Sequence, residues 1–163
     1  MAVDMFLALK GEIEGESQDS KHKNEIDVLA WSWGMSQSGS FHVGGGGGAG
    51  KVDVQDIVFT HNVDSATPAL MKFCCTGNHF DEAELVLCKA AGDKRLPYIT
   101  VKLKNVLISS VSSGGADGDP TVVESVSLNF REYEYKYQPQ SDSGGKKGGE
   151  KKCSYNVATG KAA

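Results

Sequence analysis

The sequence predicts a single, mainly β domain (1–163) whose antiparallel strands close into a barrel, with one α-helix lying against it. Three observations support this fold class. Apolar and polar residues alternate with a period of two through most of the chain, as in strands with one buried face. One segment, about residues 65–76, has helical apolar spacing instead. Several alternating runs are much longer than a typical strand of about five or six residues. The backbone hydrogen-bonding groups at the edge of such a long strand stay exposed unless the sheet closes or pairs with another chain.

The length and composition are those of one globular domain. Its 163 residues, 39% of them hydrophobic, are enough for a single core. The formal net charge of −4 gives no basic footprint for nucleic acid. No apolar run approaches the roughly 18 residues of a membrane span, and Asp4 stands where a signal peptide carries positive charge. We therefore expect a protein made in the cytoplasm, with no nucleic acid partner, no membrane insertion and no conventional export signal.

The first strands are expected within 3–9 and 25–38, where each run has one apolar face. A third run, 52–60, changes phase at Gln55 and Asp56, which indicates either a bulge or a strand buried on both faces. The apolar residues in phase are Val3, Met5 and Leu7 in the first run, and Leu29, Trp31, Trp33 and Met35 in the second.

The helical segment has its own start and stop signals. Thr67 is the expected N-cap, and Pro68 then occupies the first helical position, where its missing N–H costs nothing. Gly77 is placed to end the helix in the left-handed conformation. The apolar stripe expected to pack on the barrel consists of Leu70, Phe73 and Cys74.

Three more strands are expected within 83–90, 98–111 and 121–138. The last run changes phase at Arg131 or Glu132, as in a bulge or a strand that passes from one packing environment to another. The in-phase residues expected to form the core are Leu29, Trp31, Leu85, Leu87, Val101, Leu103, Leu128 and Phe130, with Leu70 and Phe73 of the helix packed on them.

The end of the chain has a different composition. Residues 139–152 are rich in lysine and glycine and are predicted to be a flexible link. The C-terminal segment, 153–163, is expected to add one short strand with Tyr155 and Val157 facing inward.

The chemistry-bearing residues form no catalytic pattern. The four cysteines have no C-x-x-C spacing, and two are sequence neighbours, so we expect structural thiols rather than disulfides or a metal site. No serine, cysteine or carboxylate pair stands in a motif of nucleophilic or acid–base catalysis. The cysteines are Cys74, Cys75, Cys88 and Cys153.

The stretch "FHVGGGGGAGKV" partly matches a phosphate-binding loop through Gly45, Gly50 and Lys51. Such a loop needs a Ser or Thr after the lysine and a helix that follows. Val52 stands at that position, and the strand pattern of 52–60 follows. We therefore expect no nucleotide-binding residues here.

The glycines call for another explanation, because seven of the fourteen residues in 38–51 are glycine and their ordering costs much backbone entropy. We expect a long loop that becomes ordered against a neighbouring subunit. A disordered hairpin connection without a function is the alternative.

Several stretches resemble one known family. "AVDMF", "EIDVLAWSWGMSQSGS", "GGGGGAGKV", "SATP", "SSVSSGG", "SLNF" and "YQPQ" are similar to the haemolysin-coregulated protein family, the tube component of bacterial type VI secretion. The resemblance extends from Ala2 to about Gln140 and is most specific in 25–51. It implies a two-sheet antiparallel β-barrel with one flanking helix. It also implies homohexameric rings that stack into a hollow tube. The tube lies within a contractile sheath, carries a spike protein at its tip and is expelled together with effectors.

The resemblance sets the expected function and sites. We expect a structural tube protein and not an enzyme, with no cofactor and no catalytic or metal-binding residues. Before the secretion system fires, the protein is expected in the cytoplasm; afterwards it is expected outside the cell or in a target cell. An effector enzyme fused to such a domain and a monomeric binding module with a mobile glycine loop remain as alternatives. The candidate ring-stacking loop is Ser40, Phe41, His42, Val43, Gly44, Gly45, Gly46, Gly47, Gly48, Ala49, Gly50 and Lys51, and the candidate lumen or rim loop, whose small side chains suit varied cargo, is Ser112, Ser113, Gly114, Gly115 and Ala116.

Overall fold

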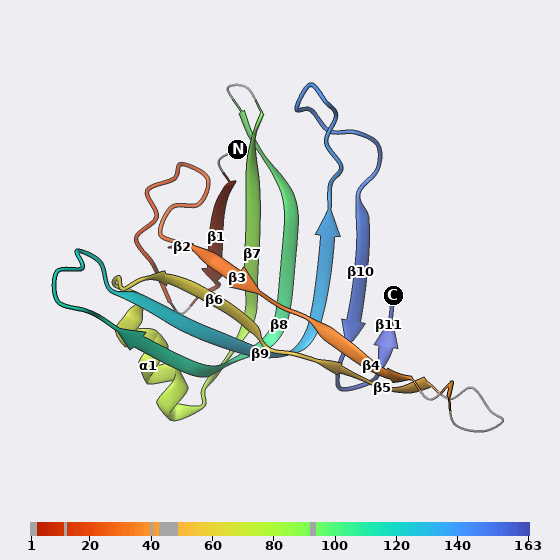
Figure 1. Ribbon diagram of the computed structural model, residues 1–163, viewed down its shortest axis with the longest axis horizontal. Helices are drawn as coiled ribbons and strands as arrows, with labels where there is room; N and C mark the ends of the chain where they lie inside the picture. Colours follow the sequence, from red (N-terminus) through yellow and green to blue (C-terminus); the bar gives the residue numbers. More distant parts are fainter. Residues whose placement is uncertain (1–2, 12, 40, 43–48, 92–93) are drawn as a thin grey trace.

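The computed structural model describes residues 3–11, 13–39, 41–42, 49–91 and 94–163. These residues form a mainly β fold with one short helix and two sheets, as predicted (Figure 1). The elements are β1 (Val3–Leu9), β2 (Ile26–Asp27), β3 (Ala30–Ser32), β4 (Met35–Gly39), β5 (Ala49–Val54), β6 (Ile57–Asn62), α1 (Thr67–Thr76), β7 (His79–Ala91), β8 (Lys94–Gly114), β9 (Val123–Tyr137), β10 (Lys151–Asn156) and β11 (Lys161–Ala162).

The larger sheet has the order β11-β10-β9-β8-β7-β1-β2, with antiparallel neighbours. The first half of β9 also pairs with β6, and β6 pairs with β3. Figure 1 shows β7, the first part of β8 and the end of β9 running upright, while β6, the end of β8 and the start of β9 cross them at a steep angle. The two groups of strands enclose the core between them. β4 and β5 form a separate two-stranded ribbon.

The segment 26–32 spans the opening between β1 and β6. β2 pairs with β1, and the N–H of Val28 donates to the carbonyl of Met5 at 2.9 Å. One residue later, the N–H of Leu29 donates to Thr60 at 2.8 Å, and β3 pairs with β6. In the described residues, the barrel is therefore joined by this crossing segment and not by one continuous ladder.

The crossing explains why Leu29 is not a core residue. The sequence predicted one continuous strand, but the chain changes partners at Val28, which is 6% exposed, and turns Leu29 outward, at 49% exposed. The other expected core positions are confirmed: Leu70, Leu85, Leu87, Val101, Leu103, Leu128 and Phe130 are buried, and Trp31 and Phe73 are partly buried against them.

Both phase changes have a structural cause. At Gln55 and Asp56 the chain leaves the ribbon at Val54 and enters β6 at Ile57, so the predicted bulge or doubly buried strand is instead a break between two strands. At Arg131 and Glu132, β9 has left β6 and pairs with β10, which confirms the predicted passage into a second packing environment.

The helix begins one residue earlier than its predicted N-cap, Thr67, would place it. Ala66 is the N-cap residue, and its N–H donates to Oδ1 of Asp64 at 2.9 Å, while Thr67 is already helical. Gly77 ends the helix with φ of 68°, as predicted. Leu70 inserts into the core and Phe73 packs edge-on against Phe80.

A buried polar pair joins the helix start to the strands. His61 of β6 and Glu124 of β9 are both 0% exposed, and Nε2 of His61 lies 2.9 Å from Oε1 of Glu124. The hydroxyl of Thr67 donates to the same carboxylate oxygen at 3.3 Å. On the other side of the imidazole, Nδ1 lies 3.8 Å from Oδ1 of Asp64. The fully desolvated pair therefore links β6, β9 and α1.

The C-terminal segment folds onto the sheet edge. Between β9 and β10 the chain makes a turn in which the N–H of Ser141 donates to Gly145 at 2.7 Å. β10 begins at Lys151 and pairs along β9, and Tyr155 and Val157 pack against the core, as predicted. The four cysteines are free thiols, as expected.

We expect Leu128→Ala to lower the free energy of unfolding by about 2–5 kcal/mol, because Leu128 is 0% exposed between Ile57 and Ile108 on the neighbouring strands. Chemical denaturation measures the change. Val123→Ala is the matched control, since Val123 lies on the same strand but is 41% exposed, and its expected effect is within about 0.5 kcal/mol. Equal losses for the two variants would contradict the assignment of the buried face.

Candidate assembly surfaces

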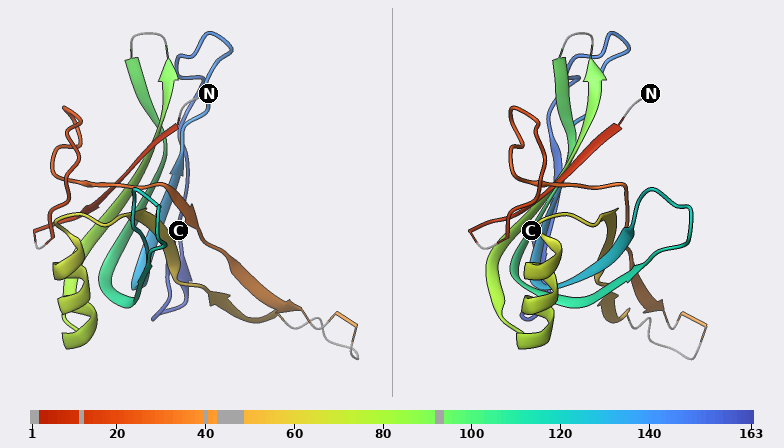
Figure 2. Two further views of the ribbon diagram at one scale, coloured as in Figure 1. Left: turned by 60° about the vertical axis from the view of Figure 1, so that its left-hand side comes forward. Right: turned by 90° about the vertical axis from the view of Figure 1, so that its left-hand side faces the viewer.

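The ribbon of β4 and β5 projects away from the barrel (Figures 1 and 2). Its strands pair from Met35 and Val54 at the base to Gly39 and Ala49 near the tip. Every residue of β4 is exposed, although Met35 at its base still contacts the barrel, where the hydroxyl of Tyr133 donates to its Sδ at 3.6 Å. A two-stranded ribbon alone is marginally stable in water, and this one is therefore suited to binding another protein surface.

The base of the ribbon is fixed to the barrel. The indole N–H of Trp33 donates to the carbonyl of Gln55 at 2.8 Å, and the ring packs edge-on against Tyr133 at 4.7 Å between centroids. Asp56 accepts from Ser109 at 2.6 Å with one carboxylate oxygen and from Asn129 at 2.8 Å with the other. These contacts set the direction in which the ribbon projects.

The candidate stacking loop lies at the tip of this ribbon. Ser40 and residues 43–48 lie outside the described residues. Phe41 is 81% exposed and His42 is exposed, whereas 49–51 belong to β5. A Cβ atom on Gly50 would lie 2.7 Å from the carbonyl oxygen of Ser38, so glycine is required there for the two strands to approach. The strand after the glycine run is the one that the sequence predicted in place of a P-loop helix.

A second surface is formed by small uncharged side chains on four neighbouring strands. The strand register places two rows of four residues side by side on β3, β6, β9 and β8, opposite the buried Phe59 and Val126. Hydroxyl groups dominate, and those of Ser110 and Ser127 lie 2.5 Å apart. The two rows, called the hydroxyl face below, are Ala30, Thr60, Ser125 and Ser112, and Ser32, Val58, Ser127 and Ser110.

The candidate lumen loop only partly coincides with a loop. Ser112, Ser113 and Gly114 are the last residues of β8 and pair with β9, contrary to the prediction, while Gly115 and Ala116 begin the exposed connection. Ser112 belongs to the hydroxyl face. Ser113 pairs with Glu124 and so lies on the opposite face of the strand.

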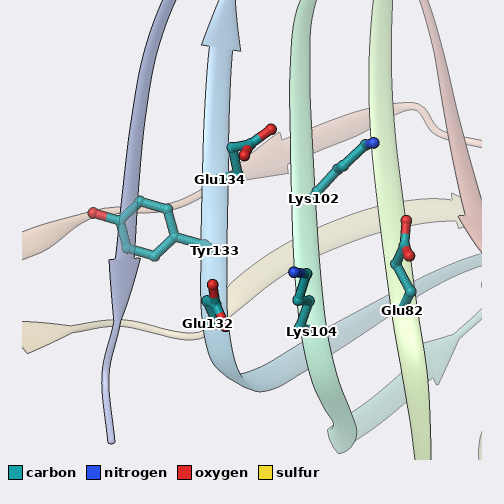
Figure 3. A pocket seen from close by; sticks show the side chains of 6 residues that line it. All are labelled: Glu82, Lys102, Lys104, Glu132, Tyr133 and Glu134. Atoms are coloured by element: carbon teal, nitrogen blue, oxygen red, sulfur yellow. The ribbon is translucent and has the colours of Figure 1, made fainter. Parts of the chain in front are cut away.

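A third surface is a charged face on β7, β8 and β9 (Figure 3). Lys104 stands between Glu82 and Glu132, and Lys102 stands between Glu84 and Glu134. Columns of negative, positive and negative charge therefore alternate across the sheet. Glu82, Lys102, Lys104, Glu132, Tyr133 and Glu134 line a hollow of about 290 Å³ there.

The edges of the charged face are also paired. Nζ of Lys10 lies 2.8 Å from Glu82, and this contact raises the pKa of Lys10 and lowers that of Glu82. Lys136 contacts Glu134 at 3.0 Å, which raises the pKa of the amine and lowers that of the carboxyl. These two contacts therefore favour the ionised form of both partners in each pair.

The described residues contain no candidate metal site. Among them, His, Cys, Asp and Glu side chains form no group of three or more that could hold an ion. In the same part of the chain, no helix has the length and apolar character needed to cross a membrane.

Comparison with known families decides the identity. A family described as "Type VI secretion system effector, Hcp" matches residues 6–137, most of the chain. The chain belongs to the Hcp family. A curated Hcp relative, "Protein hcp1" of Pseudomonas aeruginosa, is 53% identical over 157 residues, which cover 96% of each chain.

Solved Hcp structures share the fold. Hcp1 from Salmonella typhimurium is 36% identical, with a TM-score of 0.81 and complete coverage of both chains. A structure described as a type six secretion system protein is 29% identical, with a TM-score of 0.91, and covers 99% of this chain and 100% of its own. The chain is thus a β-rich member of this type VI secretion family.

Proposed function

We propose that this Hcp protein is the structural tube subunit of a type VI secretion system. Six copies form a ring, rings stack into a hollow tube, and the tube is expelled with effectors bound inside. Its other partners are the spike at the tube tip and the contractile sheath around it. The protein is cytoplasmic before firing and acts as a structural component, not an enzyme.

The projecting ribbon is the observation that carries this proposal. An exposed β4, anchored at its base through Trp33 and Asp56, directs the tip of the ribbon away from its own barrel. Phe41, a large apolar side chain at the tip, is 81% exposed. Such a ribbon gains further packing when it binds another protein chain, and we assign it to the contact between rings.

The hydroxyl face is our candidate for the wall of the lumen. Its short side chains carry no charge, whereas the charged face carries lysine and glutamate in alternation. Serine and threonine form hydrogen bonds as donors or acceptors without requiring one cargo chemistry. A neutral wall therefore suits the passage of different effectors.

This assignment predicts the effect of a charge in the wall. Ser112→Glu should lower co-purification of cargo roughly tenfold while rings persist, because a carboxylate that is desolvated against cargo costs about 1.4 kcal/mol or more. Ser20→Glu is the control, since Ser20 is exposed in the connection between β1 and β2, outside the hydroxyl face. Unchanged cargo binding by Ser112→Glu would remove the hydroxyl face as the lumen wall.

Electron microscopy of the purified protein tests the proposal. Six-fold rings with a central hole, and tubes at high protein concentration, are the expected images. A monomeric binding module is the alternative, in which the ribbon tip would bind a different protein. Uniform particles of single-subunit size at all concentrations would favour that alternative.

A further inference from the structure

One end of the subunit is acidic. Three segments, 13–16, 63–66 and 115–122, contain five carboxylates and no lysine or arginine. Hydrogen bonds hold the segments together: the N–H of Ser65 donates to Oε2 of Glu16 at 3.0 Å, and the N–H of Val63 donates to Val122 at 2.8 Å. The five side chains, called the acidic end, are Glu14, Glu16, Asp64, Asp117 and Asp119.

The C-terminal segment supplies the opposite charge. Residues 146–161 contain five lysines and a single carboxylate, Glu150. All five lysines are exposed, in the turn before β10, on β10 itself and at β11. They are called the basic end and are Lys146, Lys147, Lys151, Lys152 and Lys161.

The two ends lie on opposite sides of the molecule. In Figure 1 the connection between β8 and β9 and the start of α1 lie on the left, whereas β10 and β11 lie to the right of the upright strands, with the turn before β10 at the top and the ribbon of β4 and β5 extending further right. A subunit with complementary surfaces on opposite sides can bind copies of itself head to tail. Such heterologous contacts close into a ring when the rotation between subunits permits it.

We propose that the acidic end of one subunit docks against the basic end of the next copy and so contributes the contact that closes the ring. This inference rests on the proposed hexamer. It assigns a role to the lysine-rich tail, which has no part in the ribbon or the hydroxyl face. Lysines on an edge strand also prevent unwanted strand pairing. That reason applies to Lys151 and Lys152, which lie on the part of β10 that β11 does not cover, but not to Lys146 and Lys147 in the turn.

Reversing the charges of each end separately, and then of both ends together, tests whether the acidic end pairs with the basic end. One variant carries Lys151→Glu and Lys152→Glu, a second carries Asp117→Lys and Asp119→Lys, and a third combines all four changes. Light scattering measures the mass of each variant over a range of protein and salt concentrations, and circular dichroism verifies folding. Lys104→Glu is the control, because Lys104 is exposed on the charged face and belongs to neither end.

Each reversal alone should raise the protein concentration for half-dissociation at least tenfold, and the combined variant should recover most of the loss. Salt should weaken the wild-type ring, because surface charges are screened over about 8 Å at physiological ionic strength. A folded wild type that never exceeds a monomer would overturn the ring itself. Rings that withstand either reversal and high salt, or a combined variant no better than the single reversals, would overturn the end-to-end pairing alone.

Discussion

Glu124→Ala is expected to lower the free energy of unfolding by about 3–5 kcal/mol, the largest single-residue effect that we predict. Glu124 is 0% exposed and lies 2.9 Å from Nε2 of the equally buried His61. Its removal leaves the imidazole desolvated without its main partner and takes away the acceptor of the Thr67 hydroxyl. The loss should therefore loosen the start of α1 as well as β6 and β9.

Two further variants distinguish the loss of the buried pair from the stability loss caused by removing any carboxylate. Glu134→Ala removes a surface carboxylate, 35% exposed, that pairs with Lys136, and its expected cost is below about 1 kcal/mol. Glu124→Gln keeps an acceptor for Thr67, so its stability loss should lie between those of Glu124→Ala and Glu134→Ala. Denaturation of all three variants in urea gives the comparison. Similar stability losses at positions 124 and 134 would contradict the role of the buried pair.

Deleting Gly44–Gly48 should leave hexamers of normal mass but nearly abolish their stacking into tubes and their secretion by the type VI secretion system. The expected loss is large because each ring repeats the ribbon contact, so a shortened ribbon fails at every position at once. Ordering a glycine-rich segment costs backbone entropy, so each single contact is weak and the repeat is required. Tube length in electron micrographs and the secreted fraction are the readouts.

Replacing the same five glycines with serine is the control for this deletion, because it keeps the length of the connection. Rings and tubes should form in that variant. If the deletion yields monomers, the ribbon contributes to the interface within a ring. If it yields full tubes and normal secretion, the glycine-rich connection has no part in stacking.

The sequence predicted most of the strand-forming segments, the helix and most of the core, because period-two alternation and helical spacing report directly which side chains face inward. It failed at Leu29, where backbone partners change from β1 to β6 within a single residue. Periodicity carries no information about such a change. The helix start was misplaced by one residue because the hydroxyl of Thr67 does not cap the helix: it accepts from the N–H of Asp64 and donates to Glu124, and Ala66 is the N-cap residue.

The surfaces were harder to predict than the core. Ser112 was identified from the composition of one segment, but its partners Thr60 and Ser125 lie on other strands and are brought beside it only by the register. The alternating lysines and glutamates were visible in the sequence, yet their order across the sheet also depends on register. The two charged ends required the tertiary structure, since segments far apart in the chain form the acidic end.

The mass of the purified protein in solution tests the central claim most directly. Light scattering at near-physiological salt should give six times the 17.3 kDa of the chain, as expected of a closed ring. The mass should change little with dilution until the ring dissociates. A mass of 17.3 kDa at every accessible concentration would contradict the account of this protein as a ring-forming tube subunit.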